Sequence, residues 1–103
     1  MEEVYYEVLR VIEEVTGISV RTILSSNKEE NVDARHILVY ILHKYGFTDN
    51  KISELTKLTR PCVCMIRNNF KYRLRRYFVK LYYDRVYKII FKGKELVKNL
   101  SVN

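Results

Sequence analysis

The chain has 103 residues, with 19 Lys and Arg against 12 Asp and Glu, so its formal net charge is +7. A composition of 48% hydrophobic and 30% charged residues predicts one globular domain and excludes a disordered chain, a collagen and a disulfide-rich mini-protein. No apolar run reaches the roughly 18–20 residues of a membrane span, and the acidic start Met1-Glu2-Glu3 does not resemble a secretion signal. With only two cysteines, the chain is expected in the reducing cytoplasm, with no membrane partner.

The first third of the chain predicts two helices and a loop. Residues 3–16 carry apolar side chains at helical spacing, and Gly17 is expected to end this helix in the left-handed conformation. Ser19 is the expected N-cap of a short helix that reaches Ser25. Residues 25–31 are polar and are predicted to form a loop.

The middle of the chain predicts three further helices. One runs from about 32 to 45 and ends at Gly46, and a second runs over about 49–57 after an N-cap at Thr48. Thr59 caps the third helix, whose first turn contains Pro61, where a proline loses no helical hydrogen bond. This helix is expected to reach Asn68-Asn69.

The last segment, 70–92, predicts a long basic helix that Gly93 ends, followed by a flexible tail over 93–103. Three glycines and one proline are too few for an all-β domain or a doubly wound sheet, and no two glycines can form a phosphate-binding loop. The predicted fold is therefore all-α, with about six helices in one domain over 1–92. The expected apolar face of the last helix consists of Phe70, Leu74, Phe78, Leu81, Val86, Ile89 and Ile90.

The charge is divided unevenly along the chain. Residues 1–58 hold 7 Lys and Arg and 10 Asp and Glu, whereas residues 59–103 hold 12 Lys and Arg and 2 Asp and Glu. A half-chain with a net charge of +10 attracts polyanions, so it favours nucleic acid as a partner.

The stretch from Ile52 to Ile66 has the spacing of a DNA-binding helix-turn-helix. Leu58 occupies the turn, and Lys57 stands where a glycine is common and so needs a positive φ or a different turn. In this motif the outer face of the second helix enters a major groove. The residues expected to pack the two helices together are Ile52, Leu55, Val63 and Ile66.

The segment Val32–Leu42, with its Asp33-Ala34-Arg35 start, resembles the C-terminal DNA-binding domain of the bacterial replication initiator DnaA. The resemblance covers about residues 4–70 and implies a Trp-repressor-like helical bundle that binds double-stranded DNA. It implies a backbone contact for Arg35 and base contacts at Arg60, Pro61 and Cys62. The family signature Gly-Arg-Asp-His-(Ser/Thr)-Thr-Val is not kept here, and the loop before the Ala-Arg helix is acidic rather than basic.

Base contacts are expected from the start of the second motif helix. Phosphate contacts are expected from the turn, from the two or three free N–H groups at the helix N-terminus, and from the arginines that follow. The predicted function is sequence-specific binding of double-stranded DNA in replication or transcription control. The predicted DNA-binding residues are Arg35, Lys57, Thr59, Arg60, Pro61, Cys62, Cys64, Arg67, Asn68, Lys71, Arg75 and Arg76.

Other functions have weaker support in the sequence. Cys62 and Cys64 diverge by roughly 200° on a helix and have no third ligand nearby, so no metal or other cofactor is expected. No catalytic group is recognisable, so the chain is not expected to be an enzyme. Two alternatives stay open: an interaction module that lost DNA binding, and an RNA or single-strand binder that uses the tyrosines and arginines of the last helix. An exposed apolar face on that helix would favour a homodimer.

Overall fold

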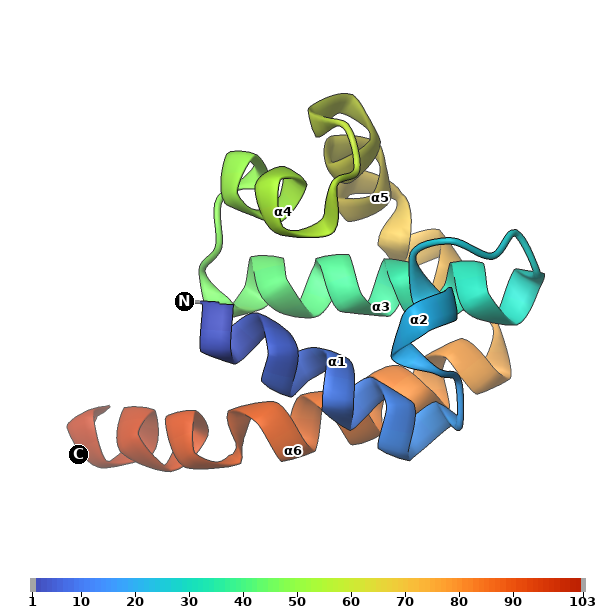
Figure 1. Ribbon diagram of the computed structural model, residues 1–103. Coiled ribbons are helices and arrows are strands. Elements are labelled where there is room, and N and C mark those ends of the chain that lie inside the picture. Colours follow the sequence, from blue (N-terminus) through green and yellow to red (C-terminus); the bar gives the residue numbers. More distant parts are fainter. Residues whose placement is uncertain (1, 103) are drawn as a thin grey trace.

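The computed structural model describes the backbone of residues 2–102 and the side chains of residues 2–92. The described residues form six helices (Figure 1), which confirms the predicted all-α fold. None of these helices is both long enough and apolar enough to cross a membrane. The helices are α1 (Glu2–Thr16), α2 (Val20–Ile23), α3 (Glu29–Tyr45), α4 (Asp49–Thr56), α5 (Arg60–Arg73) and α6 (Tyr77–Val102).

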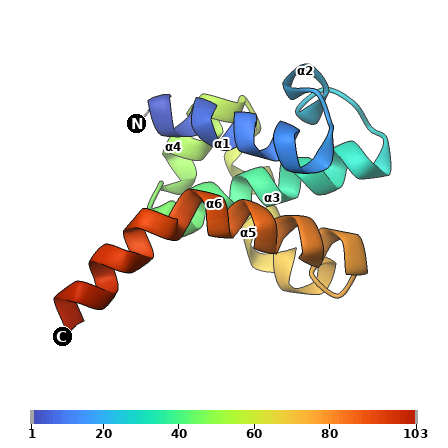
Figure 2. The same cartoon turned by 90° about the horizontal axis from the view of Figure 1, so that it is seen from below.

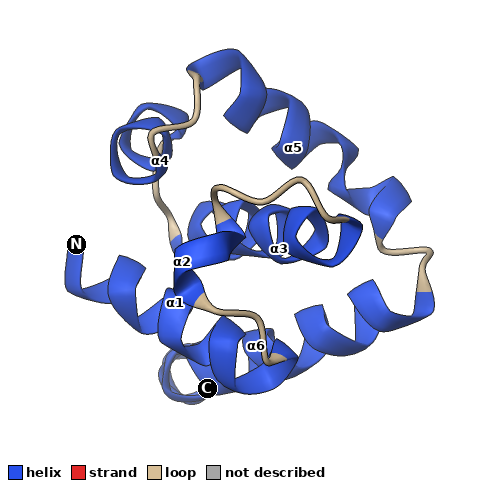
Figure 3. Cartoon of the chain, turned by 45° about the vertical axis from the view of Figure 1, so that its right-hand side comes forward, coloured by secondary structure: helices blue, strands red, loops and turns tan. Residues whose placement is uncertain are grey.

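Helix α3 is the centre of the bundle. Helices α4 and α5 lie on one side of it and α1 and α6 on the other (Figures 1 and 3), and the view from below shows α1 and α6 crossing the same side of α3 (Figure 2). A helix that is covered on several sides needs apolar residues around most of its circumference. The buried apolar residues of α3 are Ala34, Ile37, Leu38, Val39, Ile41 and Leu42.

Residues with special backbone or capping chemistry set most helix boundaries. Gly17 and Gly46 adopt positive φ values of 77° and 116° after α1 and α3, as predicted. The side chains of Ser19, Thr48 and Thr59 accept hydrogen bonds from backbone N–H groups in the first turns of α2, α4 and α5. These predicted caps are confirmed.

The predicted loop over 25–31 is wrong in its second half, because α3 begins at Glu29. Two acidic residues in the first turn favour a helix start through the helix dipole. The buried Asn31 side chain fixes the turn, because it donates to Ser26 Oγ at 2.9 Å and accepts from Thr22 Oγ1 at 3.2 Å. A polar residue therefore lies inside the helix and holds the preceding loop to it.

The predicted division near residue 70 is also wrong. Helix α5 continues to Arg73, and the chain turns at residues 74–76 before α6 begins. Phe70 thus belongs to α5, where it is fully buried against α3 and α6. At its other end α6 passes Gly93 and reaches Val102, so Gly93 does not end it. The flexibility predicted for 93–103 lies outside the described side chains.

The inward face of α6 is displaced from the predicted one. Val86 is buried as expected, but Val79 and Phe91 complete the buried face. Phe78 and Ile89, which we assigned to the same apolar face, are 62% and 51% exposed. Because α6 starts at residue 77, its orientation is set by its own contacts rather than by continuation from α5. The homodimer that an exposed apolar face would favour stays a prediction.

Candidate nucleic-acid interface

The turn between α4 and α5 consists of three residues that the neighbouring side chains hold tightly. Lys57 adopts a positive φ of 66°, which is the first of the two alternatives expected for a residue that replaces a glycine in this turn. The Ser53 hydroxyl donates to the Leu58 carbonyl at 2.6 Å, and the Leu58 N–H donates to the Thr56 hydroxyl at 3.2 Å. The position of α5 relative to α4 is therefore fixed by hydrogen bonds within the turn.

One side of α5 packs inward and the other is open to solvent. Val63 and Ile66 are buried together with Ile52 of α4, as predicted, and Leu55 and Leu58 are half-buried beside them. Helix α5 packs mainly on α3 and α4, so α6 does not cover its outer side (Figure 3). The exposed residues of this outer side are Arg60, Pro61, Met65, Asn68, Lys71 and Tyr72, with Cys64 half-exposed among them.

Some of the backbone donors at the start of α5 are used within the helix, and others are left. The Thr59 side chain accepts the Cys62 N–H at 3.3 Å, and the Thr59 carbonyl accepts the Val63 N–H at 3.0 Å. Pro61 has no N–H. Among the described residues, the N–H groups of Thr59 and Arg60 have no acceptor, so two donors are left for a ligand, which agrees with the expected two or three.

A set of four cations on and beside α5 has no acidic partner. Between Glu54 and Asp84 the chain has eight Lys and Arg and no Asp or Glu. Within the described part of the chain, four of the eight are exposed and form no ion pair. We call this set the outer cations: Lys57, Arg60, Lys71 and Arg75.

Three of the other arginines near α5 are held by acidic side chains. Arg67 makes two hydrogen bonds to Asp49 at the start of α4, at 3.1 and 2.9 Å. This contact lowers the pKa of the Asp49 carboxyl below its ordinary value. Arg73 pairs with Asp33, and Arg76 pairs with Glu29 at 2.6 Å and with Asp33 at 3.2 Å. The predicted DNA contacts of Arg67 and Arg76 would therefore compete with these ion pairs.

Arg35 is also engaged within the protein. Its Nε–H donates to the Ile23 carbonyl at 2.9 Å, and its Nη2–H donates to the Ser26 carbonyl at 2.6 Å. The guanidinium thus ties the end of α2 and the following loop to α3. We call Arg35, Arg67, Arg73 and Arg76 the inner arginines. The backbone contact that the DnaA resemblance implies for Arg35 stays a prediction.

His36 lies among these arginines and is half-buried. Burial, as the largest cause, and then the positive charges of Arg73 and Arg35 together lower the pKa of its imidazole to about 4. The imidazole is therefore neutral at pH 7. It lines a cleft of about 430 Å³ between α3 and α5, together with Met65 and Tyr72.

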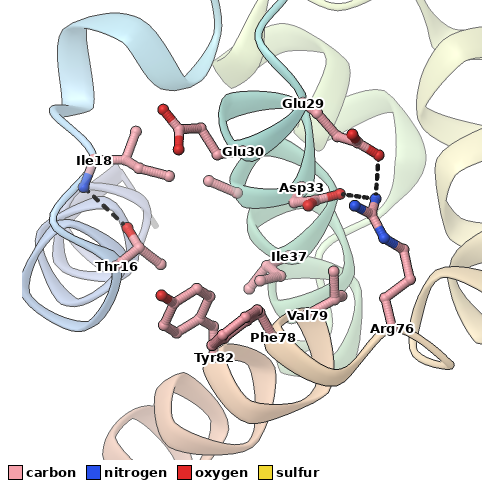
Figure 4. A pocket seen from close by; sticks show the side chains of 11 residues that line it. Thr16, Ile18, Glu29, Glu30, Asp33, Ile37, Arg76, Phe78, Val79 and Tyr82 are labelled. Atoms are coloured by element: carbon pink, nitrogen blue, oxygen red, sulfur yellow. Dashed lines mark hydrogen bonds and ion pairs between the residues drawn. The ribbon is translucent and has the colours of Figure 1, made fainter.

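A second cleft, of about 350 Å³, opens where the end of α1 faces the starts of α3 and α6 (Figure 4). Phe78 and Tyr82 lie on one wall, and Arg76 reaches across to Glu29 and Asp33. Three carboxylates and one guanidinium line this cleft, so it would repel a phosphate backbone. It is not a candidate nucleic-acid site.

Most of the tyrosines on α6 are packed rather than presented to solvent. Tyr83 stands 5.2 Å from Phe70 and 5.8 Å from Tyr40 between ring centroids, and Tyr87 stands 4.5 Å from Phe91. Burial raises the pKa of the Tyr83 hydroxyl above its ordinary value. These rings form part of the core and could not stack on bases without unfolding.

Some features of the site were absent from the sequence prediction. Tyr72 is 53% exposed and follows Pro61, Met65 and Asn68 along one stripe of α5. The spacing 61, 65, 68, 72 is the helical signal that could have placed it there.

In the described residues, no three His, Cys, Asp or Glu side chains lie close enough together to hold a metal ion.

Comparison of the chain with protein-family models, curated proteins and solved structures finds no match. The resemblance to the DnaA domain therefore rests on the sequence segments quoted above. The function must be argued from the geometry and charge of α4 and α5 themselves.

Proposed function

We propose that the protein binds double-stranded DNA in a sequence-specific manner, with α5 in a major groove. The observation that carries this proposal is the set of outer cations, which stand without acidic partners at both ends of α5. Replication or transcription control in the cytoplasm is the setting that such binding would serve.

The spacing of the outer cations supports a helix lying in a groove. Arg60 and Lys71 are eleven residues apart, which is about 16 Å along a helix axis. The major groove of B-DNA is about 12 Å wide and admits one α-helix. Cations at each end of α5 would therefore reach the two phosphate backbones that flank the groove.

The side chains between these cations support contact with base edges. Asn68 is exposed on the outer side of α5, and an asparagine can make paired hydrogen bonds to adenine. Cys64 and Met65 are compact or flexible side chains that would allow close approach. Arg60 at the helix start could contact either a phosphate or a guanine.

Salt-dependent binding tests the proposal. Fluorescence anisotropy with a blunt duplex, chosen by selection from a random library, should give a slope of log affinity against log salt near −3.6 for four phosphates, because each contributes about −0.9. Arg60→Ala and Lys71→Ala should each reduce the magnitude of this slope by about 0.9.

The matched control is Arg10→Ala. Arg10 is exposed on α1, on the other side of α3 from α5, and pairs with Glu7 and Glu14. Its removal should leave duplex affinity within twofold. Equal effects of all three substitutions, or none from Arg60→Ala and Lys71→Ala, would overturn the assignment of α5 to the groove.

A further inference from the structure

Three exposed aromatic side chains lie near the point where α5 ends and α6 begins: Tyr77 and Phe78 are in contact, and Arg75 links Tyr72 to the cleft beside Tyr77. Tyr72, Tyr77 and Phe78 are 53%, 73% and 62% exposed, and they lie within seven residues of one another. We call them the aromatic corner. Contiguous apolar surface that is exposed to solvent is a common feature of binding sites.

Neighbouring rings and cations hold the corner in place. Tyr77 and Phe78 are edge to face with centroids 5.2 Å apart, and Phe78 stacks on Tyr82 at 6.1 Å. Tyr82 is half-buried against the core, so it supports Phe78 from behind. The Tyr72 ring lies under the Lys71 ammonium, at 5.2 Å, and the Arg75 guanidinium, at 5.4 Å.

The charge beside Tyr72 and Tyr77 is positive, whereas Phe78 also borders the cleft that Glu29, Glu30 and Asp33 line. Arg75 and Tyr77 border a cleft of about 370 Å³ whose only acidic lining residue is Asp84. Lys80 pairs with Asp84 at 3.0 Å and so neutralises it. Lys71 and Arg75 are left as uncompensated charges beside exposed rings.

We infer that the aromatic corner binds unpaired bases of a single-stranded nucleic acid. Exposed rings offer faces on which bases stack, and the two uncompensated cations attract the phosphates between those bases. Paired bases inside a duplex cannot reach these rings, because they are already stacked on each other. An acidic or purely apolar partner would use either the charge or the rings, whereas a single strand uses both.

The inference goes beyond the proposed duplex binding and is tested separately from it. Lys71 and Arg75 also belong to the outer cations, so the corner is continuous with the end of α5. A duplex along α5 would bring a single-stranded overhang to the rings. The corner would then favour a junction between duplex and single strand over a blunt duplex.

Three labelled probes separate these activities by anisotropy: a ten-nucleotide oligo(dT), a ten-nucleotide oligo(U), and a blunt duplex. In the Tyr77→Ala/Phe78→Ala variant, affinity for oligo(dT) or oligo(U) should fall about 5- to 150-fold for each ring that stacks on a base. Blunt-duplex affinity should stay within twofold. The relative affinity of the two single strands identifies DNA or RNA as the source.

Matched variants keep the test specific to stacking. Tyr77→Phe and Phe78→Tyr retain both rings and should bind single strands like the wild type. Tyr6→Ala removes a 63% exposed ring from the acidic helix α1 and should have no effect. Thermal unfolding of each variant verifies that it is folded.

Three results would overturn the inference. The first is wild-type protein that binds neither single strand, whatever its duplex affinity. The second is single-strand binding that survives the loss of both rings. The third combines two measurements: light scattering shows that the wild type is a dimer and the double-alanine variant a monomer, and both bind single strands equally well. The rings would then lie between two copies of the chain. Loss of blunt-duplex binding alone would count against the proposed function and not against the corner.

Discussion

The outer cations and three of the inner arginines, Arg67, Arg73 and Arg76, come from the same part of the sequence but differ in their partners. Arg75 is exposed and unpaired, while Arg73, two residues earlier, is held by Asp33 between α5 and α3. Both contribute equally to the net charge. The comparison shows that a positive stretch of sequence can divide into residues that build the fold and residues that are free for a ligand.

The largest expected effect comes from removing an inner arginine that holds a loop. Arg35→Ala should lower the free energy of unfolding by about 2 kcal/mol, because two carbonyls lose a charged donor. Arg35→Lys should recover little of this stability, since an ammonium cannot reproduce the forked contact. Urea unfolding measures both, with exposed Arg21→Ala on α2 as the control. Two results together would contradict this structural role: Arg35→Lys is as stable as the wild type, and Arg35→Ala loses duplex binding. Arg35 would then be a DNA-binding residue like the outer cations.

A pair of substitutions two residues apart tests the division directly. Arg73→Gln should cost about 1–2 kcal/mol of stability, because it removes a partner of the largely buried Asp33 carboxylate. Arg75→Gln should change stability by less than about 0.5 kcal/mol. Arg73→Gln should therefore have the larger effect on urea unfolding, and Arg75→Gln the larger effect on the salt slope of duplex binding. The same response from both would remove the distinction.

The sequence predicts helix boundaries where capping chemistry is local and misses those that depend on packing. Gly17 and Gly46 mark the ends of α1 and α3, because a residue without a Cβ adopts a positive φ readily. Thr59 marks the start of α5, because its hydroxyl accepts a hydrogen bond from the first turn. The turn between α5 and α6 has no such mark, because Leu74-Arg75-Arg76 consists of good helix formers. Only contacts with α3 and α1 decide that the chain turns there.

The same limit applies to the candidate site. The exposure of Arg60 and Lys71 follows from helical spacing around the buried Val63 and Ile66, so the sequence predicts it. The pairing of Arg67 with Asp49 joins residues 18 apart, and that of Arg73 with Asp33 joins residues 40 apart. No local pattern shows such partners, and the exposed corner at Tyr77 was missed because its turn was missed.

The free energy of unfolding should fall at acid pH because His36, which lies among the inner arginines, is difficult to protonate in the folded protein. Its folded pKa, about 4, lies below the ordinary value of 6.5, so the unfolded chain binds the proton more readily. The stability that the neutral ring allows is complete above pH 6.5 and is lost as the pH falls from 6.5 towards 4. The loss should be on the order of 1 kcal/mol, since the partly exposed ring is screened by solvent.

The His36→Gln variant isolates this effect from the titration of carboxylates. Urea unfolding between pH 7 and pH 4 should show a smaller loss of stability in the variant than in the wild type. Arg73→Gln should also reduce the pH dependence, because it removes one of the charges that oppose protonation. An unchanged pH profile in both variants would show that His36 does not sense the inner arginines.

The smallest effect is expected at an outer cation and has the opposite sign. Lys57→Gly should raise stability by about 0.5 kcal/mol, because glycine adopts the positive φ of 66° without steric cost. The same substitution removes one phosphate contact, so duplex affinity should fall while stability rises. Lys57→Asn, which tolerates this backbone conformation, is the control for charge loss alone.

The placement of α3 between two layers gives the molecule an electric dipole moment. The layer with α4 and α5 carries eight Lys and Arg and two Asp and Glu over residues 48–76. In the opposite layer, α1 carries one Arg and five Glu, and α6 carries four Lys and Arg and one Asp over residues 77–92. Near a negatively charged partner the protein would rotate before contact, so that α5 faces the partner first. The association rate constant for any polyanion should then fall with ionic strength more steeply than it would for a protein whose charge of +7 is evenly distributed.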